Sequence, residues 1–508
     1  MRIVHNLRTF LMIFWVVLPV LLTAQRSLPF PTNSPEQEGV SSAAILSFIE
    51  RLEQEVDAVH SFMILRHGKQ ISKGWWAPYN AETPHVMHSL SKSFTATAIG
   101  LAIDEGRLTL DDQVISFFPG EIPPDTSWQL KAMRIRDLIT MNTGHQEEPR
   151  LWMAQDSWVK TFLHAKVPFK PGTHFLYNSA ATYMLSAIVQ KVTGEKLVDY
   201  LDSRLFIPLG INKPDWDLSP EGINTGGWGL HITTEDIVKL GQLYLQKGMW
   251  HGKRILSGGW VDQATSKQTS SGSNPDNDWE QGYGFQFWRC RHNCYRGDGA
   301  FGQFCIVIPE HDAVLAITSG VYDMAAVMNI VWETLLPAMQ PSPLEVDPEA
   351  SAALQQKLKD LTLPLVQGET TSPFSEKLHQ QTFQLSDNEA GVKSVLFDLN
   401  GEEHRITIEM QGGKETLQIG TDKHLIGKMN GLLPYTGSMR SLTGTSGAWT
   451  NPDEYQVKIY FYETPGSIVY TFHFSDNGMT WKSELRHALF GPREELAVLK
   501  GKAEVMID

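Results

Sequence analysis

Cysteine and positive charge are both scarce in this sequence. Three of the 508 residues are cysteine, and 43 lysines and arginines stand against 57 aspartates and glutamates, a formal net charge of −14 at pH 7. The acidic residues are spread along the chain, and no run of basic residues is present. This balance argues against a nucleic-acid-binding protein. Sequence repeats and low-complexity tracts are also absent.

The three cysteines, Cys290, Cys294 and Cys305, lie close together in the sequence. No Cys-x-x-Cys spacing occurs among them, so we expect no zinc site. In an exported protein Cys290 and Cys294 could pair across a short loop and leave Cys305 free. Free thiols at all three positions are the alternative, and the sequence leaves both open.

Long apolar runs are absent except at the N-terminus. Arg2 and Arg8 precede an apolar run at residues 10–24, which ends on Ala24. This pattern predicts a secretory signal peptide at residues 1–24, cleaved after Ala24. A retained membrane anchor is the alternative, but the run is short for a span and Pro19 interrupts it. We therefore expect a secreted or periplasmic protein without a stable membrane span after cleavage.

The length of the chain predicts more than one domain. The residue pattern changes around residues 341–343. From about residue 376 onward, apolar and polar residues alternate with period two. The alternation is clear at residues 405–410, 455–462 and 467–474, and it predicts an all-β barrel or sandwich. We expect a first domain at residues 25–340, a linker at 341–375 and the β-domain at 376–508.

The first domain has strand patterns at its two ends and helix patterns between them. Residues 61–66 and 70–76 predict a hairpin that turns at 67–69, and residues 283–288, 302–308 and 313–319 predict three further strands. Long helices are predicted near residues 43–59, 91–106, 180–192, 235–247 and 324–339. The fold class is therefore α+β, with one antiparallel sheet completed by both ends of the domain and flanked by helices.

Ser89 and Lys92 stand at the start of the helix predicted for residues 91–106. On a helix, positions i and i+3 share one face, so these two side chains are expected to meet. A serine is a weak nucleophile until a base takes its proton, and a desolvated lysine can be that base. The alternative is a serine that caps a helix next to a solvated lysine.

Two further groups stand where a serine–lysine site needs partners. Tyr177 precedes a predicted helix, and a phenol beside an ammonium can sit as a phenolate and move the proton of the serine; Ser179 can hold this network by hydrogen bonds. Gly297, Asp298, Gly299 and Ala300 lie at the start of the strand at 302–308, where one N–H could complete an oxyanion hole. An ordinary half-buried tyrosine and a tight turn into an edge strand are the alternatives.

His85 and His88 have a metal-like spacing but no third ligand, so we predict no metal.

In this order the three groups resemble the serine β-lactamase and penicillin-binding-protein superfamily, chiefly its class C-like branch. That branch includes class C β-lactamases, D-Ala-D-Ala carboxypeptidases, serine esterases and 6-aminohexanoate-dimer hydrolases. The resemblance covers about residues 38–335. Within this range, further stretches that look like the family are residues 88–94, 106–112, 135–144 and 283–303. It implies a β-lactamase/transpeptidase-like domain that needs no metal or organic cofactor.

The resemblance also implies a role for each candidate residue. Ser89 would be the acylated nucleophile, Lys92 its activator and Tyr177 the general base and acid. The backbone N–H groups of Ser89 and Ala300 would form the oxyanion hole.

Two positions depart from the family pattern. The second motif is usually Tyr-x-Asn, and here Ser179 stands in place of the asparagine. The third motif usually begins with a lysine or histidine that grips the substrate carboxylate, and here Gly297 holds that position. Arg296 or Arg291 could substitute for the missing cation, but the departure favours an esterase or amidase.

The sequence thus predicts an exported serine hydrolase that acts on ester or amide bonds of small molecules or peptides. A D-Ala-D-Ala carboxypeptidase or D-aminopeptidase and a β-lactamase are the enzymatic alternatives. A catalytically inactive ligand-binding or sensor protein on the same scaffold is the non-enzymatic one. The expected partner is a small-molecule or peptide substrate and not a nucleic acid, and the sequence predicts no oligomeric state.

Overall fold

The computed structural model describes residues 30–154, 157–379, 381–401, 403–429, 442–476, 478–487 and 495–503. The predicted signal peptide at residues 1–24 lies outside the described residues. Among those described, no helix has both the length and the apolar character needed to cross a membrane.

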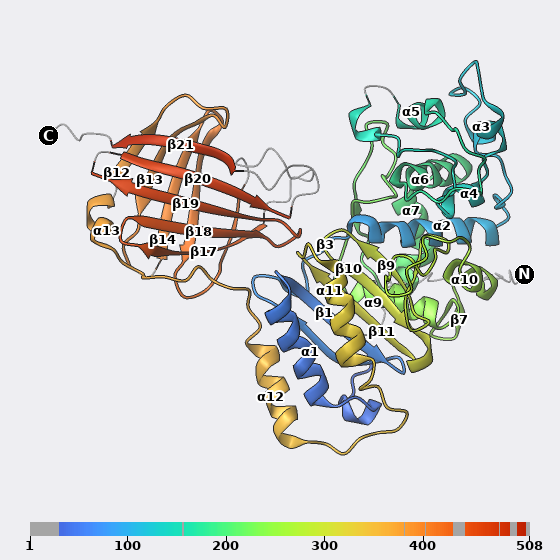
Figure 1. Cartoon of the computed structure of the whole chain (residues 1–508), viewed down its shortest axis with the longest axis horizontal. Coiled ribbons are helices and arrows are strands. Elements are labelled where there is room, and N and C mark those ends of the chain that lie inside the picture. Colours follow the sequence, from blue (N-terminus) through green and yellow to red (C-terminus); the bar gives the residue numbers. More distant parts are fainter. Residues whose placement is uncertain are drawn as a thin grey trace, which may run out of the picture.

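A mixed helix-and-sheet unit and an all-β barrel make up the described chain, and they lie beside each other (Figure 1). The mixed unit is built on a six-stranded antiparallel sheet in the order β2-β1-β11-β10-β9-β8. Its strands are β1 (Val59–Arg66), β2 (Lys69–Trp75), β8 (Trp288–Arg289), β9 (Tyr295–Gly299), β10 (Gln303–Ile308) and β11 (Ala313–Ser319). Because β1 pairs with β11, the two ends of this unit complete one sheet, as the sequence predicts.

Helices cover both faces of this sheet, which is why its central strands β1, β10 and β11 are buried at every position. On one face, Phe62 and Ile64 pack in a core with α1 (Ser42–Glu55) and α11 (Met324–Ile330). On the other face, Met63 and Leu65 belong to a core that includes α9 (Thr234–Leu245). The second core continues into a helical region above the sheet (Figure 1).

The helical region holds the elements that carry the candidate site. They are α2 (Ser91–Asp104), α3 (Trp128–Ala132), α4 (Ile135–Ile139), α5 (Trp158–His164), α6 (Ser179–Thr193), α7 (Leu197–Leu201), α8 (Ile207–Leu209) and α10 (Gly258–Thr265). Short strands join them, namely β3 (His85–Val86), β4 (Asp215–Trp216), β5 (Leu230–Ile232), β6 (Met249–Trp250) and β7 (Lys253–Arg254). The predicted helices at 91–106, 180–192 and 235–247 are confirmed.

The strand predicted at residues 283–288 is wrong except at its last residue. Only Trp288 and Arg289 form a strand there, and Gln286 has a positive φ of 59°. An ideal Cβ on Gly284 would lie 2.0 Å from the carbonyl oxygen of Ala264. The backbone turns tightly against a neighbouring helix at this point, so the apolar pattern does not produce an extended strand.

The segment predicted as a linker, residues 341–375, contains regular structure. Helix α12 (Pro348–Lys359) begins after Asp347, whose side chain accepts hydrogen bonds from two backbone N–H groups of its first turn. Leu354 is buried in the same core as α1. A second helix, α13 (Pro373–Leu378), follows at the entry to the barrel.

The C-terminal part is a closed β-barrel, so the all-β prediction is confirmed. Its strands run in the order β15-β14-β13-β12-β21-β20-β19-β18-β17-β16, and a further pairing of β15 with β17 closes the sheet. The strands are β12 (Gln381–Leu385), β13 (Val392–Asp398), β14 (Glu403–Met410), β15 (Gly413–Gly420), β16 (Leu425–Lys428), β17 (Leu442–Asn451), β18 (Glu454–Phe461), β19 (Ser467–Ser475), β20 (Gly478–Arg486) and β21 (Glu495–Ala503).

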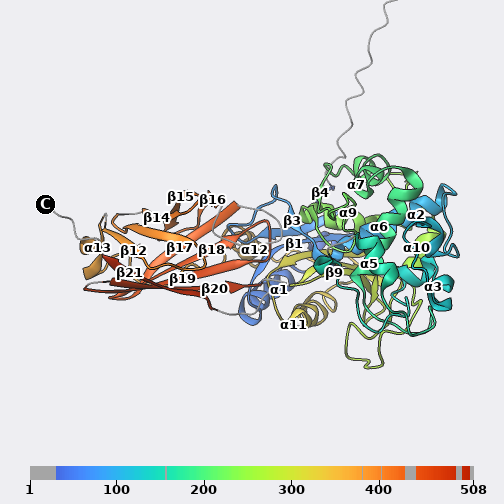
Figure 2. The ribbon, with the colours of Figure 1, turned by 90° about the horizontal axis from the view of Figure 1, so that it is seen from above.

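The barrel contacts the mixed unit close to the strand that leads into Ser89. Figure 2 shows the barrel strands at one end of the molecule and the helical region at the other. The Val86 N–H donates to the carbonyl oxygen of Glu463 at 2.9 Å, and the Tyr79 hydroxyl donates to that of Thr464 at 2.8 Å. These bonds fix the β18–β19 connection against the segment that precedes the candidate nucleophile.

Candidate functional site

Ser89 lies in a short 3₁₀ turn, His88–Leu90, that runs directly into α2. Every residue of α2 from Ser91 to Ala102 is buried, and a helix that is buried on all sides must begin and end at fixed points of the fold. Ser89 itself is partly exposed. The turn therefore presents one serine hydroxyl to solvent from a rigid support.

The side chain of Lys92 forms hydrogen bonds with Ser89, with Ser179 at the start of α6 and with the backbone of Gly227. Its Nζ is 2.9 Å from Ser89 Oγ, 3.1 Å from Ser179 Oγ and 2.7 Å from the carbonyl oxygen of Gly227. Lys92 is 2% exposed. The ammonium group is thus held by three oxygen atoms and is not the solvated first-turn lysine of the alternative interpretation.

Burial changes the acidity of Lys92. Removal from water lowers the pKa of its ammonium group to about 7, although the carboxylates of Glu148 and Asp298 act in the opposite direction. A lysine with such a pKa is a free amine in a large fraction of the molecules at neutral pH. It can then accept a proton from the hydroxyl 2.9 Å away.

Tyr177 stands across the site from Lys92. Its ring lies 4.9 Å from Lys92 Nζ and stacks on Trp288 at a centroid distance of 5.5 Å. Burial and then Asp298 raise the pKa of the Tyr177 phenol well above its ordinary value, although a hydrogen bond with Ser89 partly opposes this shift. The phenol is therefore neutral at pH 7, and the phenolate that the sequence suggests is disfavoured.

Ser179 begins α6, and the start of this helix brings in a carboxylate that the sequence analysis did not identify. Glu148 Oε1 accepts the backbone N–H of Ser179 at 2.7 Å and that of Ala180 at 3.2 Å. These bonds provide a partner for the first N–H groups of the helix, which have none within the helix. Glu148 precedes Ser179 by 31 residues, so no local pattern in the sequence indicates this contact.

Gly297 and Gly299 lie in β9 and pack directly on the nucleophile turn. An ideal Cβ on Gly299 would lie 2.1 Å from the Met87 carbonyl oxygen and 3.1 Å from Ser89 N. One on Gly297 would lie 2.5 Å from Ser93 Oγ. Only glycine allows β9 to pass this close to the turn.

The position of this motif in the fold corrects the sequence prediction. Gly297, Asp298 and Gly299 end strand β9, whereas the sequence placed them at the start of the next strand. Ala300 follows in a tight turn to β10, in which Phe301 has a positive φ of 65°. The turn brings Ala300 to the end of the strand that lies against Ser89.

The comparisons with known proteins agree with this geometry. A family profile described as Beta-lactamase matches residues 49–336, which is more than half of the chain.

The chain belongs to the Beta-lactamase family.

This is a family of serine hydrolases, and the relatives differ in activity. The chain is 24% identical over 307 residues to the 6-aminohexanoate-dimer hydrolase of Paenarthrobacter ureafaciens, an alignment covering 56% of this chain and 78% of the relative. It is 23% identical over 235 residues to a protein of Escherichia coli strain K12 whose name proposes a D-alanyl-D-alanine carboxypeptidase, which covers 40% of this chain and 54% of the relative.

A solved structure shows the same fold. A Bacillus anthracis protein whose name proposes a 6-aminohexanoate-dimer hydrolase superposes with a TM-score of 0.51 at 19% identity, over 61% of this chain and 87% of that protein. The β-lactamase-like fold of the mixed unit is therefore established, with the barrel following it.

Arg296 and Arg291, the two candidates to replace the missing cation of the third motif, both pair with aspartates. Arg296 is 0% exposed and pairs with Asp298 at 2.8 Å. Arg291 pairs with Asp278 at 2.8 Å and donates to Asn329 Oδ1 at 2.6 Å. Both guanidinium groups are committed to structural partners, so neither can take the place of a lysine or histidine at Gly297.

The histidine pair and the three cysteines that the sequence analysis considered are buried in this Beta-lactamase-family fold, apart from His88, which is partly exposed. His85 is buried and shares a hydrogen bond with His60 at 3.2 Å. In the described part of the chain no group of three metal-ligating side chains forms. Cys290, Cys294 and Cys305 are buried and unpaired, and burial raises the pKa of the Cys290 thiol to about 11.

Proposed function

We propose that this protein is a serine hydrolase that forms an acyl-enzyme on Ser89. The observation that carries the proposal is the 2.9 Å contact between Ser89 Oγ and the buried Nζ of Lys92. A serine that only caps a helix has no need of a desolvated lysine beside it. The lowered pKa of Lys92 supplies the base that a serine hydroxyl requires for attack.

Acylation begins when the free amine of Lys92 takes the Ser89 proton as Oγ attacks the substrate carbonyl carbon. The carbonyl oxygen becomes an oxyanion. The N–H groups of Ser89 and Ala300 are the donors we assign to it, since β9 brings the turn at Ala300 against the nucleophile turn. Lys92, once protonated, is held by Ser179 Oγ and by the Gly227 carbonyl oxygen.

The leaving group must then gain a proton. We assign this step to Tyr177, whose neutral phenol can donate to the departing oxygen or nitrogen and recover a proton from Lys92. Water attacks the acyl-enzyme in the second half of the cycle and gives up a proton to the same pair. Hydrolysis of the Ser89 ester returns the free acid and the starting hydroxyl.

Esters and amides without an obligatory carboxylate are the substrates that this site favours. Arg296 and Arg291 are paired with aspartates, so neither is free to grip a substrate carboxylate as the third-motif cation of a carboxypeptidase or a β-lactamase does. By its name, one relative hydrolyses the 6-aminohexanoate dimer, whose linkage is an amide bond, and this favours an amide or ester as the bond that is cleaved. We rank carboxypeptidase and β-lactamase activities below an esterase or amidase for this reason.

The proposal includes export and the division of the chain. The apolar run at residues 10–24 supports a signal peptide cleaved after Ala24 and a secreted or periplasmic location. We assign residues 25–340 to the hydrolase domain and 376–508 to the β-domain, with 341–375 between them.

A substrate panel tests the proposed activity. We expect short-chain p-nitrophenyl esters to be hydrolysed with a kcat/KM at least about tenfold above that for nitrocefin or a D-Ala-D-Ala peptide. A preference for nitrocefin or for the D-Ala-D-Ala peptide would contradict the assignment, and so would the absence of turnover with every substrate.

Glu148→Gln is expected to move the pH profile of hydrolysis. The activity should rise with pH as Lys92 loses its proton, around pH 7. The Glu148 carboxylate favours the charged lysine, so its neutralisation lowers the Lys92 pKa and moves this rise to lower pH. A glutamine oxygen can still accept the N–H groups of Ser179 and Ala180, so kcat/KM on the high-pH plateau should stay within roughly threefold of wild type.

The neighbouring exposed carboxylate provides the control for this variant. Glu147→Gln removes the same charge one residue away and should leave the profile in place. A Glu148→Gln profile that coincides with wild type, or one that moves to higher pH, would contradict the placement of Glu148 beside Lys92.

Gly299→Ala is expected to lower kcat by about a hundredfold or more, with a smaller change in KM. The new Cβ would meet the Met87 carbonyl oxygen at 2.1 Å, so β9 must move away from the turn that carries Ser89. Steady-state kinetics measures the effect. Gly259→Ala, where an added Cβ meets no atom within 4 Å, is the matched control. Equal kinetics for the two variants would show that the contact of β9 with Ser89 does not set the rate.

A further inference from the structure

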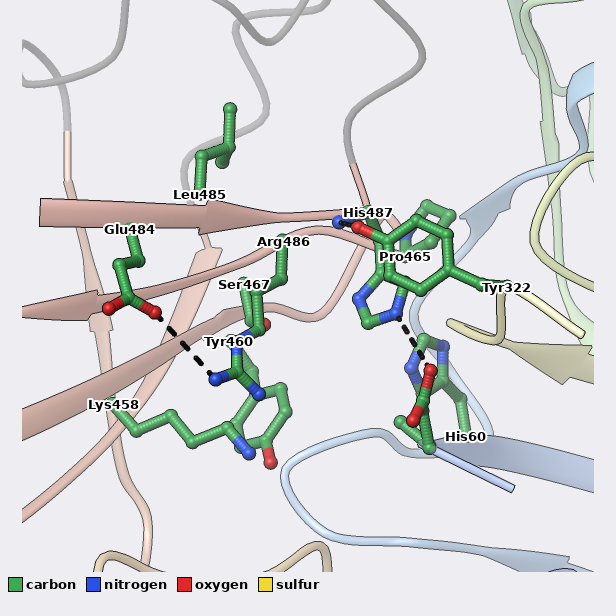
Figure 3. Close-up of a pocket in the computed structure, with 12 residues that line it drawn as sticks. His60, Tyr322, Lys458, Tyr460, Pro465, Ser467, Glu484, Leu485, Arg486 and His487 are labelled. Carbon is green, nitrogen blue, oxygen red and sulfur yellow. Dashed lines mark hydrogen bonds and ion pairs between the residues drawn. The ribbon is translucent and has the colours of Figure 1, made fainter. Parts of the chain in front are cut away.

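Outside the hydrolase site, a cavity of about 390 Å³ lies between the mixed unit and the barrel (Figure 3). Asp57, His60 and Tyr322 line it from the mixed unit. Lys458 on β18 and the end of β20, at Arg486 and His487, line it from the barrel. The cavity is thus assembled only when the two parts of the chain meet.

Two cationic side chains face each other on the barrel side of this cavity. Lys458 Nζ lies over the Tyr460 ring at 4.7 Å, and among the described residues it has no hydrogen bond or ion pair. The Arg486 guanidinium lies near enough to oppose the charge on Lys458. Figure 3 shows the heads of both side chains directed into the same space. Of the described carboxylates, only that of Asp57, which is 60% exposed, favours the charge on Lys458. A half-buried ammonium with so weak a counter-ion carries an electrostatic cost that a bound anion would reduce.

The carboxylates of the cavity lie at its rim and neutralise these cations poorly. Glu484 approaches Arg486 at 3.8 Å, but both side chains are about half exposed, at 49% and 52%. Asp57 is 60% exposed and lies 3.7 Å from His487 Nε2. Exposed pairs at such distances contribute little in water, so these carboxylates offset only a small part of the positive charge of Lys458 and Arg486.

The histidines of the cavity are neutral hydrogen-bonding groups. Burial lowers the pKa of His487 to about 4 and that of His60 well below its ordinary value. His60 Nε2 is buried without a hydrogen-bond partner. These two imidazoles add uncharged polar groups to the lining of the cavity, which suits the remainder of a small polar molecule.

We propose that this cavity binds a small organic anion, with its carboxylate or phosphate group between Lys458 and Arg486. The ligand contacts both parts of the chain at once. On the mixed-unit side it lies beside Tyr322, which stacks on His487 at 4.4 Å and accepts the backbone N–H of His487 at 2.8 Å. Binding therefore ties the barrel to the hydrolase unit. This site is separate from the proposed hydrolytic centre, and its test does not depend on turnover.

Calorimetric titration of the full chain with succinate and with glycerol 3-phosphate tests this site, at constant ionic strength kept by sodium chloride. We expect saturable one-site binding of at least one probe, and the tighter of the two identifies a carboxylate or a phosphate site. Lys458→Met and Arg486→Gln should each weaken that binding at least about tenfold. Arg405→Gln, an exposed change elsewhere on the barrel, should not.

Proton uptake is the second measurement. Burial and then Arg486 lower the Lys458 pKa to about 8. The groups that face Lys458 in the cavity are Asp57, His60, Tyr460, Glu484, Arg486 and His487. An anion beside Lys458 favours its charged form, so binding at pH 8 should take up a proton and the heat should depend on the ionisation enthalpy of the buffer. Lys458→Met should abolish the uptake.

Two results would overturn the proposal. One is the absence of saturable binding of either probe up to about 10 mM. The other is binding that the Lys458 and Arg486 variants leave unchanged while they retain the wild-type melting temperature. A variant that loses its fold is replaced by Lys458→Gln, which keeps a polar head at the same position.

Discussion

Ser89→Ala is expected to lower kcat/KM for a p-nitrophenyl ester by roughly 10⁴-fold or more. The reason is chemical, because alanine has no atom that can form the acyl bond. The fold should remain, since Ser89 is partly exposed and lies in a turn supported by the buried helix α2. Steady-state release of p-nitrophenol measures the change.

Two serines provide the comparison for this variant. Ser179→Ala removes a hydroxyl that holds Lys92 at 3.1 Å and should cost about ten- to a hundredfold. Ser116→Ala, an exposed hydroxyl in a separate 3₁₀ turn, should have no effect. If Ser89→Ala kept activity within tenfold of wild type, another nucleophile would have to be found.

Lys92→Met is expected to lower kcat/KM by about 10²- to 10⁴-fold, the range in which a positioned base contributes. Methionine fills much of the buried volume of the lysine but cannot accept the proton of Ser89. The pH profile of the residual activity should also lose its rise near pH 7, because that rise belongs to the Lys92 ammonium group. The melting temperature should not fall, since a desolvated charge has been removed.

Lys92→Arg separates a base from a simple positive charge. A guanidinium keeps the charge but does not deprotonate in this pH range, so arginine should be as inactive as methionine. If Lys92→Arg restored activity, Lys92 would act by electrostatic attraction and the first base would have to be another group.

Much of the fold could be predicted from local patterns. The hairpin at β1 and β2 follows from two apolar runs and a short polar turn around Gly68, and α9 from the helix start at Thr233, whose side chain accepts the N–H of Asp236. The barrel follows from period-two alternation. In each case neighbours in the sequence determine the structure.

The failures occur where distant contacts override a local pattern. Residues 283–288 read as a strand, but Gly284 is fixed against the Ala264 carbonyl oxygen and the chain bends. The segment predicted as a linker, residues 341–375, also contains α12, whose apolar partner α1 lies some 300 residues earlier. Composition alone cannot show such a partner.

In the candidate site too, some contacts follow from local sequence patterns and others arise only in the folded chain. Ser89 and Lys92 meet because three residues separate them on a helical turn, and Tyr177 and Ser179 are found by their place before a helix. Glu148 lies 31 residues before Ser179 in the sequence, and only the folding of the chain brings the two into contact. The neutral state of Tyr177 depends on burial, which the sequence does not give. Sequence patterns therefore predict the candidate groups, and the structure adds the burial that shifts their pKa values.

The covalent intermediate is the most direct test of the account. Wild-type protein is mixed with a p-nitrophenyl ester, quenched with acid within the first turnovers and measured by intact mass, followed by peptide mapping. The account predicts one added acyl mass per chain, located on the peptide that contains Ser89, and no added mass in Ser89→Ala. An adduct on another residue, or an equal adduct in Ser89→Ala, would contradict the assignment of the nucleophile.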